Sequence, residues 1–257
     1  MSAVTSVPAS RVVERTATIE LPSGELTYTL RRSPRARRLR VVVDPRHGVV
    51  VTVPLRWRGG SASDAVAAFL VERDRWLRRH LDRHDDARRR AADPRTGLLF
   101  LGVPSRIHVE SPDGHRRSAV VPGTDELVVR MGSAERREPD RVLETWLREQ
   151  AKSVIDGHVR LHAPALGVTV SAVTLRDPRT RWGSASRTGR LSFSWRLILA
   201  PPEALETVVI HELAHLRVFG HGTAFWALVA SRRADHRVWR RWLREHAPEL
   251  HLALASG

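Results

Sequence analysis

The chain has 257 residues, of which 42% are hydrophobic, so it is long enough to bury one large core or two smaller ones. Its 43 Lys and Arg residues outnumber 28 Asp and Glu residues, and the net charge of +15 points to an anionic partner such as a nucleotide or nucleic acid. The absence of cysteine excludes a disulfide-stabilised scaffold, and no apolar run is long enough for a signal peptide or a membrane span. We therefore expect a cytoplasmic protein without a membrane partner.

This positive charge is almost entirely arginine, since Lys152 is the single lysine. Many of the arginines lie beside Asp or Glu in the sequence. Charged side chains are normally solvated, so any one arginine cluster is interpreted first as an exposed face.

The first half of the chain predicts a flexible tail over residues 1–15 and a β-rich region over residues 16–131. Short runs rich in β-branched residues at 16–21, 26–31, 39–43 and 49–53 predict a small antiparallel sheet. Apolar positions at helical spacing from Val66 to Leu81 then predict one amphipathic helix, followed by a polar linker over residues 84–94. Further strands are predicted at 98–103, 106–110, 117–121 and 126–130, with a hairpin turn at residues 112–114.

A change of composition at residues 132–139 predicts that a separate catalytic domain occupies residues 132–257. Pro139 is suited to the first turn of a long helix. Strands are predicted at 168–175 and 191–199, and the polar, turn-rich segment between them is predicted to be a loop. A helix is predicted to begin at Pro201 or Pro202 and to end at Gly220, with terminal helices after it. The predicted fold class is α+β.

The predicted helix after Pro202 carries the residues with the clearest chemistry. His211 and His215 are four residues apart, so in a helix both rings leave the same face and can bind one metal ion. Glu212 completes an H-E-x-x-H motif, in which the carboxylate takes a proton from metal-bound water instead of binding the metal. A chain reversal at Gly220 would return His221 to the same ion as a third ligand.

Three protein ligands and one open position are typical of catalytic zinc, whereas structural zinc usually has four ligands with cysteine prominent. The chain has no cysteine, so we predict one catalytic Zn²⁺ per chain. Asp235 and His236 are the alternative candidates for the third ligand, because they lie further along the chain.

Four segments in this order resemble the YgjP-like metallopeptidase family, whose wider relatives are the SprT and WLM zinc proteases: RWGSAS at 181–186, LSFSWRLILAP at 191–201, HELAH at 211–215 and GHGTAFW at 220–226. The resemblance also extends to residues 28–38 and 64–80. It implies a zincin-like catalytic domain in which His211, His215 and His221 bind the metal and Glu212 is the catalytic base.

Candidate substrate-binding residues precede the metal motif. Arg181, Arg196, Arg179 and the backbone N–H near Gly183 are candidates for stabilising a developing oxyanion. Trp182 is a candidate substrate contact, although an indole ring more often serves packing.

Three functions remain open from the sequence. The first is a zinc metallopeptidase acting on a peptide or protein, since a strand before the metal helix offers an edge for an extended peptide. The alternative is a nucleotide pyrophosphatase, because the arginine excess suits a triphosphate and some YgjP-like relatives are described as pyrophosphatases. The second alternative is a non-catalytic, metal-containing nucleic-acid-binding module, which the presence of Glu212 disfavours.

Overall fold

The computed structural model describes residues 12–44, 47–58, 60–92, 97–110, 117–178 and 180–254. The chain divides into two compact units, Met1–Asp86 and Ala87–Gly257. The hairpin turn predicted at residues 112–114 and Arg179 both lie outside the described residues.

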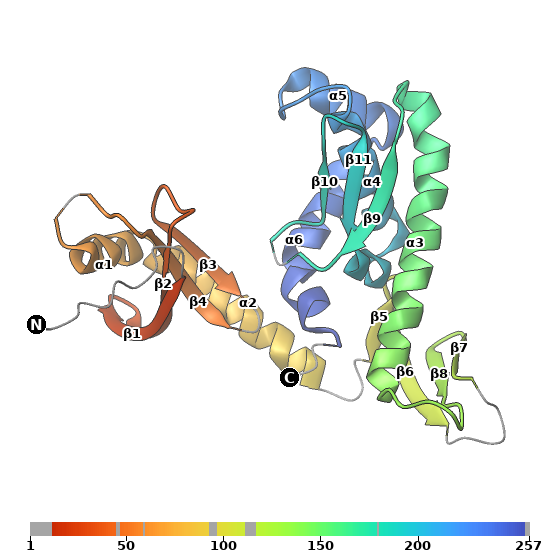
Figure 1. The fold of residues 1–257 in the computed structure, drawn as a ribbon, viewed down its shortest axis with the longest axis horizontal. Helices are drawn as coiled ribbons and strands as arrows, with labels where there is room; N and C mark the ends of the chain where they lie inside the picture. Colours follow the sequence, from red (N-terminus) through yellow and green to blue (C-terminus); the bar gives the residue numbers. More distant parts are fainter. Residues whose placement is uncertain are drawn as a thin grey trace, which may run out of the picture. The chain divides into compact units, whose positions relative to one another are not determined.

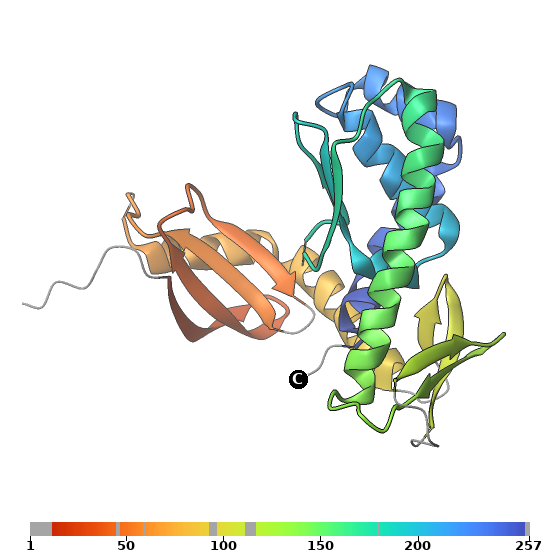
Figure 2. The ribbon, with the colours of Figure 1, turned by 45° about the vertical axis from the view of Figure 1, so that its right-hand side comes forward.

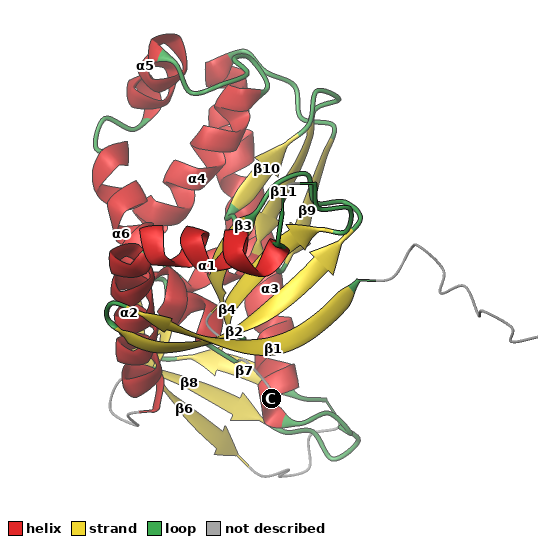
Figure 3. Cartoon of the chain, turned by 90° about the vertical axis from the view of Figure 1, so that its left-hand side faces the viewer, coloured by secondary structure: helices red, strands yellow, loops and turns green. Residues whose placement is uncertain are grey.

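The N-terminal unit is a four-stranded sheet with helices on one face (Figure 3). Its strand order is β1-β2-β4-β3, in which β2 and β4 run parallel and the other neighbours antiparallel. Leu30 and Val51 from the sheet and Leu70 and Leu77 from the helices share one buried cluster. The elements are β1 (Val13–Leu21), β2 (Gly24–Ser33), β3 (Arg40–Asp44), β4 (Gly48–Pro54), α1 (Ala62–Glu72) and α2 (Asp74–Ala92), the last of which continues past the unit's end at Asp86.

Four predictions for this region are corrected. Strand β1 begins at Val13, so the end of the expected tail is part of the sheet, and the parallel β2–β4 pair makes the sheet mixed instead of antiparallel. The single predicted helix is two helices, because α1 ends at Glu72 and the buried Asp74 begins α2 while it accepts a hydrogen bond from Ser23. Much of the predicted linker is helical, since α2 continues to Ala92.

The C-terminal unit begins with a second sheet, which packs on a long helix (Figure 1). Leu98, Leu127 and Val129 of this sheet share one buried cluster with Leu143 and Leu147 of the helix. The elements are β5 (Leu98–Phe100), β6 (Val103–Glu110), β7 (Ala119–Pro122), β8 (Glu126–Arg130) and α3 (Pro139–Leu166), with strand order β5-β6-β8-β7. The boundary expected at residues 131/132 therefore lies instead after Asp86, because the strands from 98 to 130 complete the core that α3 needs.

The remaining elements form a third sheet and a helical layer, and α3 runs beside both (Figure 2). The sheet order is β10-β11-β9, which leaves β10 at an edge. The elements are β9 (Ala172–Arg176), β10 (Gly183–Ala185), β11 (Arg190–Ser194), the 3₁₀ helix η1 (Trp195–Leu199), α4 (Pro202–His215), α5 (Thr223–Arg232) and α6 (His236–Leu252).

Three sequence predictions in this part are corrected. The strand predicted at 191–199 ends at Ser194, whose hydroxyl accepts a hydrogen bond from the backbone N–H of Arg196 and so starts η1. The predicted loop between the two strands contains β10, which pairs antiparallel with β11. Helix α4 begins at Pro202 as predicted and ends at His215, ahead of the Gly220 stop, which has a φ of 104°.

Helix α4 is the most enclosed helix of the site region. Leu205, Val209 and Leu213 face the main core, while Ile210 and Ala214 pack with Phe225 and Val229 of α5 in a separate cluster. A helix that is apolar on nearly all sides is held firmly from several directions. None of the helices in the described ranges is both long and apolar enough to cross a membrane.

Candidate metal centre

Three histidines meet at the end of α4. One ring nitrogen from each of His211, His215 and His221 lies within 4.8 Å of those of the other two. His211 and His215 are one turn apart on α4, and His221 returns after the reversal at Gly220, with its Nε2 atom 3.2 Å from Nε2 of His211. The structure thus brings together the three histidines that the sequence selected, and it brings in neither alternative for the third position.

The aromatic ring of Phe225 supports all three imidazoles. Its centroid lies 4.9 Å from His211, 4.5 Å from His215 and 4.9 Å from His221. His215 is fixed further by a contact of 3.3 Å between its Nδ1 atom and the carbonyl oxygen of Val218. Rings held in this way have little freedom to rearrange when a ligand binds.

Burial keeps two of these imidazoles neutral. Burial, followed by the nearby His215 and His221, lowers the pKa of His211 to about 3. Burial also lowers the pKa of His215, although its contact with Val218 opposes the shift. Since a metal ion binds the neutral imidazole, this donor set fits a divalent metal.

Glu212 lies beside this cluster on the same helix and is only 6% exposed. Burial raises its pKa to about 7, and the positive charge of Arg181 opposes the rise. A carboxyl group with a pKa near neutrality can both take and return a proton, as a general base and acid must.

Strand β10 makes a close contact with Glu212 that depends on glycine. A Cβ atom built on Gly183 would lie 2.6 Å from Cγ and 2.7 Å from Oε1 of Glu212, closer than real Cβ contacts. The absence of a side chain at Gly183 therefore allows the carboxyl group to occupy its place against the strand.

The backbone of β10 is open on the side away from β11. The N–H of Ser194 donates to the carbonyl of Trp182 at 2.8 Å, and the N–H of Ser186 donates to the carbonyl of Arg190 at 2.9 Å. Backbone bonding alternates along an antiparallel pair, so the N–H groups of Gly183 and Ala185 point away from β11. Gly183, whose N–H lies on this open edge, is also the residue whose Cβ position faces the side chain of Glu212.

Two other predicted substrate contacts, Arg181 and Trp182, differ in how far they are exposed. Arg181 is exposed and lies close enough to influence Glu212. Trp182 is half-buried and its ring stacks on His251, with centroids 4.8 Å apart, which is a packing role.

The prediction that Arg196 binds substrate is corrected. Arg196 is 2% exposed, and its guanidinium group donates to both carboxylate oxygens of Asp177, at 2.8 and 3.1 Å. It also donates to the carbonyls of Leu250, at 3.1 Å, and Ala253. The guanidinium group of Arg196 therefore already bonds Asp177 and the C-terminal end of α6. It links α6 to η1 and does not face a substrate site.

Neither alternative third ligand belongs to the group of His211, His215 and His221. Asp235 accepts a hydrogen bond of 2.7 Å from Trp239 and is paired with Arg233 at 2.9 Å. His236 is buried and its ring stacks on Trp226, with centroids 5.3 Å apart.

A second cluster of possible metal-binding side chains, His158, His162 and Glu206, joins α3 to α4. Nε2 of His162 lies 2.8 Å from Oε1 of Glu206, while Arg233 donates to Oε2 of the same carboxylate at 2.9 Å. Both oxygens of Glu206 therefore already have partners, which makes this a buried polar network between helices. The sequence analysis missed it, although the four-residue spacing of the two histidines on a helix was a visible signal.

Comparison with known proteins gives one result. A family model, the YgjP-like metallopeptidase domain, matches residues 37–246. Neither the curated proteins nor the solved structures include a match to this chain. The family model covers most of the chain, and the protein is therefore a member of the YgjP-like metallopeptidase family and a metal-dependent hydrolase.

Proposed function

We propose that the protein is a zinc-dependent peptidase with a zincin-like site, in which His211, His215 and His221 bind one Zn²⁺ and Glu212 is the general base. The observation that carries the proposal is the convergence of three imidazoles beside one buried carboxyl group. An all-histidine set of three ligands leaves one position for water, as in catalytic zinc sites.

Zinc bound there would lower the pKa of a coordinated water to about 7 and polarise the substrate carbonyl. Glu212 holds the proton removed from that water and passes it to the leaving amine. Its raised pKa, about 7, suits both steps near neutral pH. The exposed guanidinium group of Arg181, whose charge acts on Glu212, would stabilise negative charge that develops there.

The edge of β10 supports a peptide as substrate. An extended peptide that pairs with the outward N–H groups of Gly183 and Ala185 would add to the sheet as a new strand beside β10. Because Gly183 touches the side chain of Glu212, a peptide on this edge would present its backbone carbonyls next to the base. A nucleotide has no backbone that requires such an edge.

The alternative is a metal-dependent hydrolase of nucleotide phosphoanhydrides, such as a nucleotide pyrophosphatase. It would use the same metal and base, and Arg181 is the observation in its favour, because a guanidinium group binds phosphate well. The second alternative, a non-catalytic nucleic-acid-binding module, leaves the buried Glu212 beside the histidines without a purpose.

Metal analysis and a hydrolysis screen together test the proposal. His211→Ala, His215→Ala and His221→Ala should each lower bound zinc at least tenfold, while the exposed His108→Ala on β6 should retain about one zinc per chain. Hydrolysis of a peptide pool by the wild type, with no release of phosphate or pyrophosphate from nucleoside triphosphates, would support the peptidase. The reverse pattern would establish the phosphoanhydride hydrolase, and unchanged zinc in His221→Ala would refute the third ligand.

A further inference from the structure

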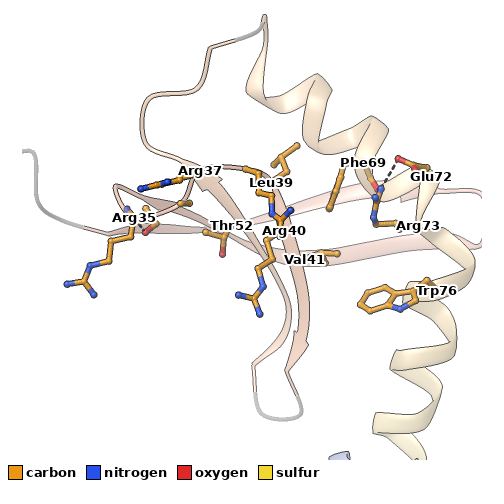
Figure 4. A pocket seen from close by; sticks show the side chains of 13 residues that line it. Arg35, Arg37, Leu39, Arg40, Val41, Thr52, Phe69, Glu72, Arg73 and Trp76 are labelled. Carbon is orange, nitrogen blue, oxygen red and sulfur yellow. Dashed lines mark hydrogen bonds and ion pairs between the residues drawn. The ribbon is translucent and has the colours of Figure 1, made fainter. Parts of the chain in front are cut away.

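A groove of about 1440 Å³ is lined by residues of the N-terminal unit, whereas the histidine cluster belongs to the C-terminal unit. One side is formed by the connection from β2 to β3 and the start of β3, and the other by the end of α1 and the start of α2 (Figure 4). The groove is larger than most pockets for small molecules, which measure about 300–1,000 Å³.

The β-strand side of the groove is strongly basic. Four arginines line it within a stretch of six residues: Arg35, Arg37, Arg38 and Arg40. All four are exposed, and none of them forms an ion pair with a carboxylate of the part of the chain that the structure describes. The one acidic residue among the described lining, Glu72, is already paired with Arg73 at 2.7 Å. This side of the groove thus carries four positive charges that are not neutralised by the described residues.

The helical side of the groove presents aromatic rings. Phe69 and Trp76 are both half-buried and both line the groove. The guanidinium carbon of Arg73 lies 3.9 Å from the centroid of the Phe69 ring, and the His80 ring lies 4.0 Å from that of Trp76. Figure 4 shows Phe69, Arg73 and Trp76 following one another along this side. Each ring is supported by a neighbour and remains part of the groove wall.

We propose that this groove binds a single-stranded nucleic acid segment. The unpaired guanidinium groups suit successive phosphates, and the aromatic rings on the opposite side suit stacking of unpaired bases. An acidic peptide would use the arginines and leave the rings without a role. The proposal does not depend on the metal centre, so its failure would leave the proposed hydrolase function unchanged.

The test measures binding of the full-length protein to a labelled oligothymidylate of about 12 nucleotides, within the usual range of single-strand sites. Fluorescence anisotropy in the presence of a chelator prevents any metal-dependent cleavage. The triple variant Arg37→Gln, Arg38→Gln, Arg40→Gln should bind at least tenfold more weakly. Its plot of log affinity against log salt should lose about 2 units of slope, as three lost phosphate contacts require.

A matched control removes the same charge from the same unit outside the groove. Arg15, Arg75 and Arg79 are exposed and none lines the groove, so Arg15→Gln, Arg75→Gln, Arg79→Gln should keep wild-type affinity within about threefold. Equal weakening in both triple variants would mean that general charge drives binding, and it would overturn the proposal.

The stacking role of the Trp76 ring is tested by two substitutions at that position. Trp76→Phe retains a stacking face and should keep most of the affinity, whereas Trp76→Leu retains only apolar bulk and should lose at least fivefold. Thermal melting shows whether each variant is folded, and Phe69→Leu takes the place of Trp76→Leu if that variant is not. Equal affinity of the Phe and Leu variants would refute stacking. Competition by polyglutamate or by a single nucleoside triphosphate as effective as that of the oligonucleotide would overturn the proposed ligand.

Discussion

The position of the Glu212 side chain depends on the absence of a side chain at Gly183. The backbone of Gly183 occupies the space beside the carboxyl group, and a Cβ atom there would meet Cγ and Oε1 at 2.6 and 2.7 Å. Since φ at Gly183 is not in the left-handed region, the requirement for glycine here is one of space and not of backbone conformation.

We predict that Gly183→Ala lowers the rate of hydrolysis by at least tenfold while zinc remains bound. The added methyl group must displace the base, because the three atoms nearest to it all belong to Glu212. Gly157→Ala is the matched control, because nothing lies within 4 Å of the Cβ position in α3. This control should keep full activity and gain about 0.5–1 kcal/mol of stability from helix propensity. Full activity in Gly183→Ala would contradict the account of the contact.

The buried carboxyl group of Glu212 also predicts a pH effect on the metal-free protein. Its pKa is raised from 4.5 to about 7, so between these values the folded state binds more protons than the unfolded state. This group therefore lowers the free energy of unfolding as pH rises through that range. Glu212→Gln does not titrate there, and it should gain stability relative to the wild type between pH 4.5 and 8, on the order of 1–3 kcal/mol. Urea unfolding of both proteins with a chelator measures the difference, and a constant difference would show that burial does not raise this pKa.

The grouping of the three histidines could be predicted from the sequence, because His211 and His215 are one turn apart on α4 and His221 follows shortly after the end of that helix. The sequence misplaced Arg196, whose partners Asp177 and Leu250 are distant in the chain and are brought near only by folding. For the same reason it gave no indication of the contact between Gly183 and Glu212.

Among the elements, β10 and α4 make the site together. Helix α4 supplies Glu212 and two of the histidines, and β10 supplies an open edge and the glycine that contacts Glu212. Helix α3 and the network of Glu206, His162 and Arg233 hold α4 from the other side. The rigidity of α4 therefore comes from burial and from polar contacts at its first turns.

The open edge of β10 predicts a selective effect of proline. Ala185→Pro removes an N–H that points away from β11, so the pairing of β10 with β11 is retained. If peptides bind by adding to this edge, the KM for a peptide substrate should rise at least fivefold while the zinc content stays the same. Ala185→Ser keeps the N–H and should behave as the wild type. An unchanged KM in the proline variant would exclude this edge as the peptide-binding site.

Element types were predicted best where the apolar period is long, as in α3 and α4, and least well where a local polar contact decides the outcome. The hydroxyl of Ser194 converts the end of a predicted strand into η1, and Asp74 divides one predicted helix into two. Strand β10 has only three residues and no apolar alternation, so nothing in its sequence distinguished it from a loop.

At the scale of the whole chain, the unit that contains the metal centre is larger than the sequence predicted. The composition change at residues 132–139 reflects a turn before α3 and not the edge of a core. Leu98, Val120 and Leu127 lie in the same buried cluster as the apolar face of α3. The family model, which covers residues 37–246, likewise spans both units.

We predict that a fragment of residues 87–257 is soluble, melts cooperatively and binds zinc. A fragment of residues 132–257 should aggregate, because removing the sheet of β5 to β8 exposes Leu143 and Leu147 of α3. Expression of both fragments, with measurement of solubility, melting and zinc content, compares them directly. A soluble, zinc-loaded fragment of residues 132–257 would restore the boundary that the sequence predicted.

The most direct test of the proposed chemistry is the hydrolysis rate of Glu212→Gln, measured with its zinc content on the same sample. The base acts on the metal-bound water and does not bind the ion, so the variant should hold about one zinc per chain and lose activity by at least a hundredfold. Near wild-type hydrolysis by this variant with zinc bound would contradict the role of Glu212. Loss of zinc together with activity would show that Glu212 serves the metal site itself.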